Sequence, residues 1–380
     1  MIKLLLIGVF KKHNVMIRAK ITVVLGLAVL MACCQKPVEK STNPIAEQLE
    51  SVKGKGILFG HQDDLAYGMN WSYVDGESDV KRVAGDYPAM FGWELGGVEL
   101  KNTHDLDSIP FQVMKDLVVK GYEMGGVNTF SWHPFSVING ENAWNTETDV
   151  VKHILQNGSH HKEFLVQLDR VADFLQSLKT GDGEVVPFIF RPWHEMDGTW
   201  FWWGAKNCTP DEFKELFRFS VDYLKNKKGL SQMLVAYSPD RNFTSLEEYL
   251  TWYPGDDVVD IIGMDNYYDL KMPDGEKEAI KKLHILIAYA KEKQKFSALT
   301  ETGLENVTDS LWFTQKLGKV VSDSLVSKEL SYVMVWRNDP KVHFFFPYEN
   351  HSAATDAKSF LDQPEMLLLN DFNKLKKINN

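Results

Sequence analysis

Residues 186–226 read VPFIFRPWHEMDGTWFWWGAKNCTPDEFKELFRFSVDYLKN, an apolar run followed by a polar and aromatic cluster and then by a charged segment. The run at 186–190 is typical of a strand that is buried on both faces. From 210 to 226 the apolar residues recur at helical spacing, and Thr209 before Pro210 is a good N-cap. The stretch therefore predicts one strand-loop-helix unit of a parallel sheet.

The same alternation continues through the rest of the chain. Segments with helical spacing lie at 163–178, 210–226, 279–293 and 311–322. Short apolar runs predict eight strands, at 56–59, 88–93, 123–130, 186–190, 233–237, 259–264, 296–299 and 332–335. Eight strand-helix alternations in one domain predict an α/β fold, a (β/α)8 TIM barrel. An open doubly wound sheet is the alternative, but no glycine-rich phosphate loop follows the first strand.

Functional side chains of such a barrel gather at the carboxyl ends of its strands. Polar and aromatic residues follow each predicted strand in this sequence, as that geometry requires. They are His61, Gln62 and Asp63; Glu94; Trp132 and His133; Arg191, Trp193, His194 and Glu195; Ser238 and Asp240; Asp265 and Tyr267; Glu301; and Trp336 and Arg337.

Two glutamates stand out, because Glu195 follows the fourth predicted strand and Glu301 follows the seventh. These strands lie on opposite sides of an eight-stranded barrel, so we expect the two carboxyl groups to face each other across a cleft. Glycoside hydrolysis uses such a pair: one group protonates the leaving oxygen while the other acts at the anomeric carbon. Trp193, Met196 and Trp200 supply apolar surroundings that would raise the pKa of Glu195 by desolvation.

The order of the motifs resembles glycoside hydrolase family 26, whose best-known members are β-mannanases. The resemblance covers essentially the whole domain. It rests on RPWHE at 191–195 with WFWWG at 200–204, TETG at 300–303, GMDNY at 263–267, SWH at 131–133 and WRN at 336–338.

The resemblance implies retaining hydrolysis of β-1,4-mannan or manno-oligosaccharides without a metal or other cofactor. It makes Glu195 the general acid/base and Glu301 the nucleophile. His194 would form a hydrogen bond near the nucleophile or the sugar, and Tyr267 would bond to the nucleophile carboxylate. A tyrosine hydroxyl can hold a carboxylate ionised and aligned.

Four further residues are expected to contact the sugar by the same resemblance. Trp336 would be the apolar floor under the sugar on the non-reducing side of the cleaved bond, and Trp200 would line the other side. His133 and Arg337 would contact sugar hydroxyls further out. Indole faces suit these positions, because the C–H faces of pyranose rings pack flat on them.

Other interpretations remain open. Either glutamate could be a structural ion-pair partner of Arg191 or Arg337. A metal-dependent barrel hydrolase would want a His-x-His sequence after the first strand or a His-Glu-x-x-His helix, and the sequence has neither. The protein could also be a non-catalytic glycan-binding lipoprotein, or could act on another β-glycan such as β-1,3-xylan or mixed-linkage glucan.

Charge and cysteine content restrict the partners. The net charge is −10 and basic clusters are scarce, which argues against a nucleic-acid partner. Cys33, Cys34 and Cys208 are the only cysteines of the sequence, too few for a disulfide framework. We expect the protein to act as a monomer.

The first residues resemble a lipoprotein signal. Basic residues between 11 and 20 precede an apolar run at 21–31 that is too short to span a membrane. The LMAC sequence at 30–33 resembles the bacterial lipobox, in which the cysteine is lipidated; a non-lipidated signal cut nearby is the alternative. We expect lipidation at Cys33 and a location in the cell envelope, facing the periplasm or on the outer-membrane surface. The predicted segments are a signal peptide at 1–32, a lipidated cysteine and tether at 33–41, and a catalytic domain at 42–380.

Overall fold

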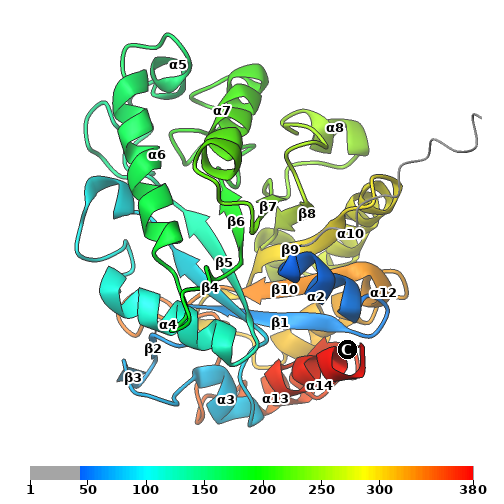
Figure 1. The fold of residues 1–380 in the computed structure, drawn as a ribbon. Helices are drawn as coiled ribbons and strands as arrows, with labels where there is room; N and C mark the ends of the chain where they lie inside the picture. Colours follow the sequence, from blue (N-terminus) through cyan, green and yellow to red (C-terminus); the bar gives the residue numbers. More distant parts are fainter. Residues whose placement is uncertain (1–42, 380) are drawn as a thin grey trace, which may run out of the picture. The chain divides into compact units, whose positions relative to one another are not determined.

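Eight parallel strands form a closed barrel in the computed structural model of the protein, which describes residues 43–379 (Figure 1). Each strand pairs with its neighbours in chain order, and β10 pairs with β1 to close the ring. The barrel strands are β1 Ile57–Gln62, β4 Met90–Glu94, β5 Val127–Trp132, β6 Phe188–Pro192, β7 Met233–Tyr237, β8 Ile261–Asp265, β9 Phe296–Thr302 and β10 Leu330–Val335. The predicted (β/α)8 barrel and all eight predicted strands are confirmed.

Helices surround the barrel. They are α2 Pro44–Val52, α3 Asp79–Ala84, α4 Phe111–Glu123, α5 Val151–Ile154, α6 His161–Gln176, α7 Pro210–Asp222, α8 Leu246–Leu250, α9 Tyr268–Lys271, α10 Gly275–Glu292, α11 Gly318–Val321, α12 Val326–Glu329, α13 Ala354–Leu361 and α14 Leu369–Asn379. The 3₁₀ turns are η1 Val98–Leu100 and η3 Glu305–Val307, and the π-helical turns are η2 Tyr223–Lys227 and η4 Phe313–Leu317. Short strands complete the inventory: β2 Tyr67–Gly68, β3 Trp71–Ser72 and β11 Met366–Leu367.

The helix predictions hold with shifted ends. Thr209 caps α7 in a capping box with Glu212, as the sequence around Pro210 indicated. The segment predicted as one helix at 311–322 is instead a π-helical turn followed by α11. None of the helices in the described part of the chain combines the length and the apolar character that a membrane crossing needs.

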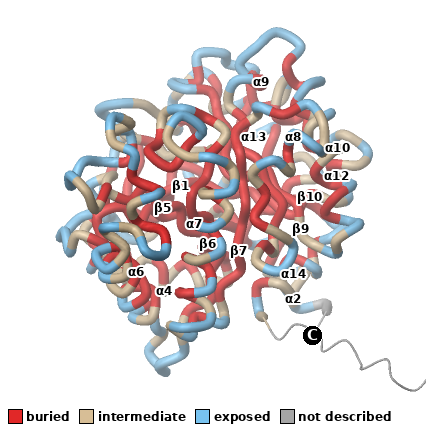
Figure 2. Tube along the Cα trace, turned by 90° about the horizontal axis from the view of Figure 1, so that it is seen from above, coloured by how far each residue is buried: buried red, intermediate tan, exposed pale blue. Residues whose placement is uncertain are grey.

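Side chains of the strands alternate between the barrel interior and the helix layer, because the side-chain period of a strand is two. In β6, Ile189 belongs to the inner apolar cluster, so Arg191 two residues later also faces the interior. Leu49 of α2 and Phe372 of α14 join the same inner cluster and close the end of the barrel where the strands begin. Figure 2 shows the buried strands at the centre and exposed segments around them. A functional site can therefore form only at the opposite end of the barrel, where the strands finish.

The predicted signal peptide at 1–32, Cys33 and the tether at 33–41 lie outside the described residues. Cys208 is a free cysteine.

Candidate active site

A cleft of about 740 Å³ lies at the carboxyl ends of the barrel strands. Its walls come from the loops after β5, β6, β7, β8, β9 and β10. Seven of the predicted site residues line it: His133, His194, Glu195, Trp200, Tyr267, Glu301 and Trp336.

Glu195 stands in a strained turn after β6. Trp193 and Glu195 both have left-handed backbone, with φ of 54° and 53°, and such a residue costs about 1–3 kcal/mol. Two hydrogen bonds hold the turn: the Glu195 N–H donates to the Ser238 carbonyl at 2.8 Å, and Trp203 Nε1 donates to the His194 carbonyl at 2.9 Å. The turn places the Glu195 carboxyl group in the cleft.

Glu301 reaches the cleft through a bulge in β9. Met264 of β8 lies opposite Leu299, and the next residue, Asp265, lies opposite Glu301, so β9 carries one extra residue. A β-bulge re-aims side chains and is frequent next to active sites. Here the extra residue is Thr300, whose hydroxyl donates to Asp265 Oδ1 at 2.7 Å, while Glu301 lines the cleft.

Two groups hold the carboxylate of Glu301. Arg191 forms an ion pair with Oε1 through Nη2, and the Tyr267 hydroxyl donates to Oε2 at 2.8 Å. Burial, together with the charges of Glu301 and Glu195, raises the pKa of Tyr267 well above its usual value, so its hydroxyl remains a donor. Both contacts fix the orientation of the Glu301 carboxyl group.

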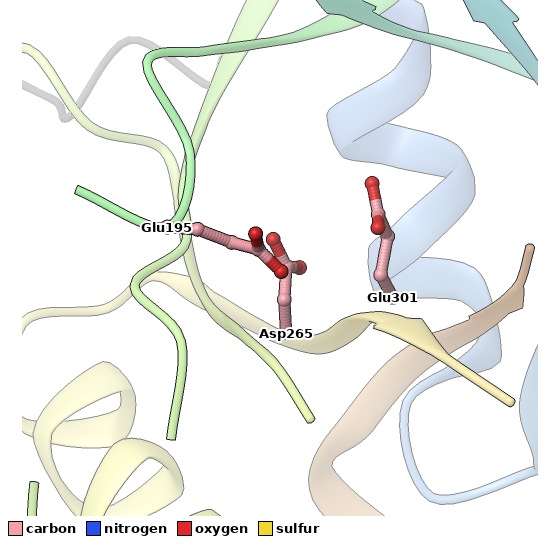
Figure 3. Close-up of side chains that lie close together, drawn as sticks. All are labelled: Glu195, Asp265 and Glu301. Atoms are coloured by element: carbon pink, nitrogen blue, oxygen red, sulfur yellow. The ribbon is translucent and has the colours of Figure 1, made fainter. Parts of the chain in front are cut away.

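Asp265 is a third carboxylate of the site. One oxygen each of Glu195, Asp265 and Glu301 lies within 4.8 Å of the others. Figure 3 shows the carboxyl groups of Glu195 and Asp265 next to each other, with Glu301 across from them. Such a group could bind a metal ion. Arg191 already supplies positive charge to two of the three carboxylates, since its Nη1 lies 2.8 Å from Asp265 Oδ2.

The environment of Glu195 favours its protonated form. Burial raises its pKa well above the usual value, and the carboxylates of Asp265, Glu301 and Asp240 raise it further. Trp200 opposes this rise, because its Nε1 donates to Glu195 Oε2 at 2.7 Å and stabilises the ionised form. The site therefore holds one carboxyl group whose surroundings raise its pKa and another that is bound by Arg191 and Tyr267, a contrast that suits acid and nucleophile roles.

His133 and His194 form a buried pair beside Glu94. His133 Nδ1 is 2.8 Å from Glu94 Oε2, and His133 Nε2 is 3.0 Å from His194 Nε2. Burial works against the charged form of His133, but Glu94 outweighs it and raises the pKa of His133. Burial and the Arg191 charge lower the pKa of His194 well below its usual value. The opposite directions of these two pKa shifts favour a proton on His133 and a hydrogen bond from His133 to His194.

Indole rings form much of the cleft wall. Trp336 packs edge-on against His133, with ring centroids 6.4 Å apart. Trp144 stacks on the same imidazole at 5.1 Å and is 52% exposed. Trp200 lies so close to Gly198 that a Cβ there would approach its ring to 2.4 Å, so glycine is required for the seating of this indole. Trp202 and Trp203 are buried.

Arg337 lies outside the set of residues that line the cleft. Its Nε is 3.0 Å from Asp107 Oδ1, and its Nη1 contacts Asp339 at 2.9 Å and the Tyr67 hydroxyl at 3.1 Å. The contact with sugar hydroxyls expected for Arg337 stays a prediction.

Residues 35–317 match the family model described as glycosyl hydrolase family 26. The chain belongs to this family. The matched segment of the family 26 domain contains both glutamates, and the resemblance found in the sequence motifs is confirmed.

Relatives of this family 26 chain have been characterised. A mannan endo-1,4-beta-mannosidase of Bifidobacterium adolescentis is 30% identical over 356 residues, which is 87% of this chain and 35% of that protein. A second mannan endo-1,4-beta-mannosidase, from Bacillus subtilis, is 28% identical over 68% of this chain and 74% of its own length. The solved structure of a GH26 beta-mannanase from Bacteroides ovatus is 40% identical with a TM-score of 0.82, over 87% of this chain and 95% of that one. The chain thus spans about a third of the Bifidobacterium protein.

The sequence did not reveal what several contributors to the family 26 site do in the cleft. Arg191 and Asp265 stand inside the quoted motifs, but their ion pair depends on strands that are distant in the chain. Asp240 was noted only as a residue that follows a strand. Trp144 lies in a long loop without periodicity, and nothing in the sequence marks it as a wall of the cleft.

The neighbours of Glu195 predict how activity depends on pH. An acid must be protonated, so kcat/KM should fall as pH rises through the pKa of Glu195. Trp200→Phe removes a hydrogen bond that lowers this pKa and should move the alkaline limb to higher pH. Asp240→Asn removes a negative charge that raises it and should move the limb to lower pH.

The measurement is kcat/KM against pH for the wild-type protein and both variants. The opposite directions provide the control, since a general loss of stability would shift both variants the same way. Limbs that move together would contradict the assignment of this limb to Glu195.

Proposed function

We propose that this protein is a retaining glycoside hydrolase that cleaves the β-1,4-mannosidic bonds of mannan or galactomannan, within the chain or from its end. Glu195 acts as the general acid/base and Glu301 as the nucleophile. One observation carries the proposal: two carboxyl groups in contrasting environments present oxygens within 4.8 Å of each other in one cleft.

One oxygen of Glu195 and one of Glu301 lie within 4.8 Å of each other, and this close approach supports retention. Carboxyl groups of inverting enzymes stand about 6.5–9.5 Å apart to admit a water molecule, whereas those of retaining enzymes stand about 5–5.5 Å apart. In the first step Glu195 gives its proton to the glycosidic oxygen while Glu301 bonds to the anomeric carbon and the sugar leaving group departs. In the second step Glu195 takes a proton from water, whose oxygen replaces Glu301 at the same carbon.

The surrounding residues suit both steps. Arg191 and Tyr267 hold the Glu301 carboxyl group in place in the cleft. After Glu301 has bonded to the sugar, the Asp265 carboxylate and Arg191 remain as a fixed ion pair beside the anomeric carbon. Such preorganised charges stabilise the transition state without having to reorient during the reaction.

The substrate is inferred from relatives. The characterised proteins of Bifidobacterium and Bacillus are named mannan endo-1,4-beta-mannosidases, and the Bacteroides structure is of a beta-mannanase. These names favour mannan over β-1,3-xylan or mixed-linkage glucan. The presence of both carboxylates with their partners favours catalysis over a purely glycan-binding role.

A comparison of polysaccharides tests this proposal. We expect reducing ends to be released from β-1,4-mannan, and proton NMR of the first product to show the β-anomer before mutarotation. If reducing ends were released only from β-1,3-xylan or mixed-linkage glucan, the proposed substrate would be wrong. An α-anomer as the first product would contradict double displacement.

Trp336 is expected to support the sugar on the non-reducing side of the cleaved bond. Loss of the indole in Trp336→Ala removes apolar contact in both the ground state and the transition state, so binding and turnover should weaken together. We expect kcat/KM to fall roughly 100-fold. Because Trp336 also packs on His133, a melting curve must show that the variant is folded. Unchanged kinetics in a folded variant would place Trp336 outside the site.

The protein is further proposed to be a lipoprotein of the cell envelope, anchored at Cys33. The LMAC sequence at 30–33 supports this location. Attached acyl chains bind membranes strongly, whereas a polar tether does not. Wild-type protein should therefore sediment with membranes, and Cys33→Ala should appear in the soluble fraction. Cys34→Ala is the matched control and should remain bound. Equal membrane binding of the wild-type and Cys33→Ala proteins would contradict the lipid anchor.

A further inference from the structure

The cleft has an aromatic and cationic platform that the proposed chemistry does not use. Tyr268 begins α9 and is 47% exposed, although it lines the cleft. The guanidinium carbon of Arg241 lies 4.1 Å from the centre of its ring. Lys271, one helical turn after Tyr268, also lines the cleft. We refer to these three residues as the Tyr268 platform.

The platform stands one residue outward from the reaction centre on two different loops. In the loop after β8, Tyr267 contacts Glu301, and Tyr268 is the next residue. In the loop after β7, Asp240 acts on the pKa of Glu195, and Arg241 is the next residue. Consecutive Cα atoms are about 3.8 Å apart. Arg241 and Tyr268 contact each other, and each is one residue away from a side chain that acts on Glu195 or Glu301.

The loop after β7 is fixed to the turn that carries Glu195. The carboxylate of Asp197 accepts hydrogen bonds from the backbone N–H of Asp240 at 2.7 Å and of Asn242 at 3.2 Å. The Asp240 carboxylate in turn binds the Arg241 guanidinium. Arg241 is thus held in place over Tyr268 before any ligand arrives, so the ring presents a preformed surface at little entropic cost.

Strand order decides on which side of the cleaved bond the platform lies. Glu195 follows β6 and Glu301 ends β9, so a line between them divides the barrel mouth. Arg241 and Tyr268 follow β7 and β8 on one side of that line. Trp336 follows β10 on the other side, next to β1. Because the two carboxyl groups flank the scissile bond, sugar units on either side of that bond occupy opposite halves.

Resting on the proposed function, in which Trp336 supports the sugar on the non-reducing side, we propose that the Tyr268 platform binds a hexopyranose unit on the leaving-group side. Arg241 covers one face of the ring, which leaves the other face and the edge of Tyr268 for the C–H face of a pyranose. Lys271 can donate hydrogen bonds to the hydroxyls of that sugar. The same surface receives sugar acceptors that compete with water in the second step.

Substrates that differ only in their leaving group test this proposal. Mannopentaose leaves a sugar on the platform, whereas β-mannobiosyl fluoride releases only fluoride and cannot use it. Tyr268→Ala should lower kcat/KM for mannopentaose roughly tenfold and leave that for the fluoride within about twofold of wild type. Added mannobiose should also capture a smaller share of the glycosyl-enzyme in Tyr268→Ala.

Tyr268→Phe is the matched control, because it keeps the ring, and it should resemble wild type on both substrates. Equal losses of Tyr268→Ala on the two substrates would mean that the ring acts through Tyr267 and Glu301, which overturns the platform. Wild-type kinetics of Tyr268→Ala on both would overturn it as well. If the wild-type protein turned over neither mannopentaose nor β-mannobiosyl fluoride, the proposed function itself would be refuted.

Discussion

Glu301→Ala should lower kcat/KM on β-1,4-mannan by a factor on the order of 10⁵. The variant has no carboxylate to bond to the anomeric carbon, so the covalent intermediate cannot form. Arg191 keeps Asp265 as a partner, which leaves the charge network partly intact. Activity should return in part when azide is added to an aryl β-mannobioside with a good leaving group. Azide enters from the vacated face, and the product should be the α-azide.

The anomeric configuration of the azide, read by NMR, is the informative result. Glu301→Gln is the matched control for shape, since its side chain still fills the space beside Tyr267. It should be inactive, and azide should restore less activity to it than to Glu301→Ala. A Glu301→Ala protein that cleaves mannan at the wild-type rate would remove Glu301 from the mechanism.

Glu195→Ala should behave differently, because it removes a proton donor and leaves the nucleophile. Cleavage of mannan should slow by about 10²–10⁴-fold, as expected for the loss of a general acid. An aryl mannobioside that needs little protonation should still form the intermediate on Glu301. Its hydrolysis then lacks a base, so the intermediate should accumulate, and azide should restore turnover to give the β-azide.

A burst of aryl alcohol followed by slow turnover is the kinetic signature to measure for Glu195→Ala. Trp200→Phe provides a control, because it removes a partner of Glu195 while the carboxyl group itself remains. If Glu195→Ala gives the α-azide and Glu301→Ala the β-azide, the two roles are exchanged.

The ion pair between Arg191 and Glu301 reconciles two interpretations of the sequence. A glutamate at a strand end could have been a structural partner of Arg191, and Glu301 does form that pair. The pair lies in the cleft, and the guanidinium also binds Asp265. An ion pair at this position fixes the orientation of the Glu301 carboxyl group, so the structural contact serves the proposed chemistry.

The sequence by itself determined the barrel and the position of its chemistry. Short apolar runs that alternate with amphipathic segments can bury both faces of a parallel sheet in only a few ways, so all eight strands were predictable. The parallel arrangement then brings all strand ends to one rim, which is why Glu195, Tyr267 and Glu301 could be assigned to one cleft. The helix α4 was not among the predicted helical segments.

Only the tertiary structure decided how the site works, because its properties depend on contacts between residues that are distant in the chain. The bulge at Thr300 aims Glu301, and it depends on the pairing of β9 with β8. The strain at Glu195 is held by Ser238 of another loop. The raised pKa of Glu195 needs burial and the charges of Asp265 and Glu301, which no local pattern encodes. Local propensity sets the elements, whereas burial, charge and aim are fixed only when the barrel closes.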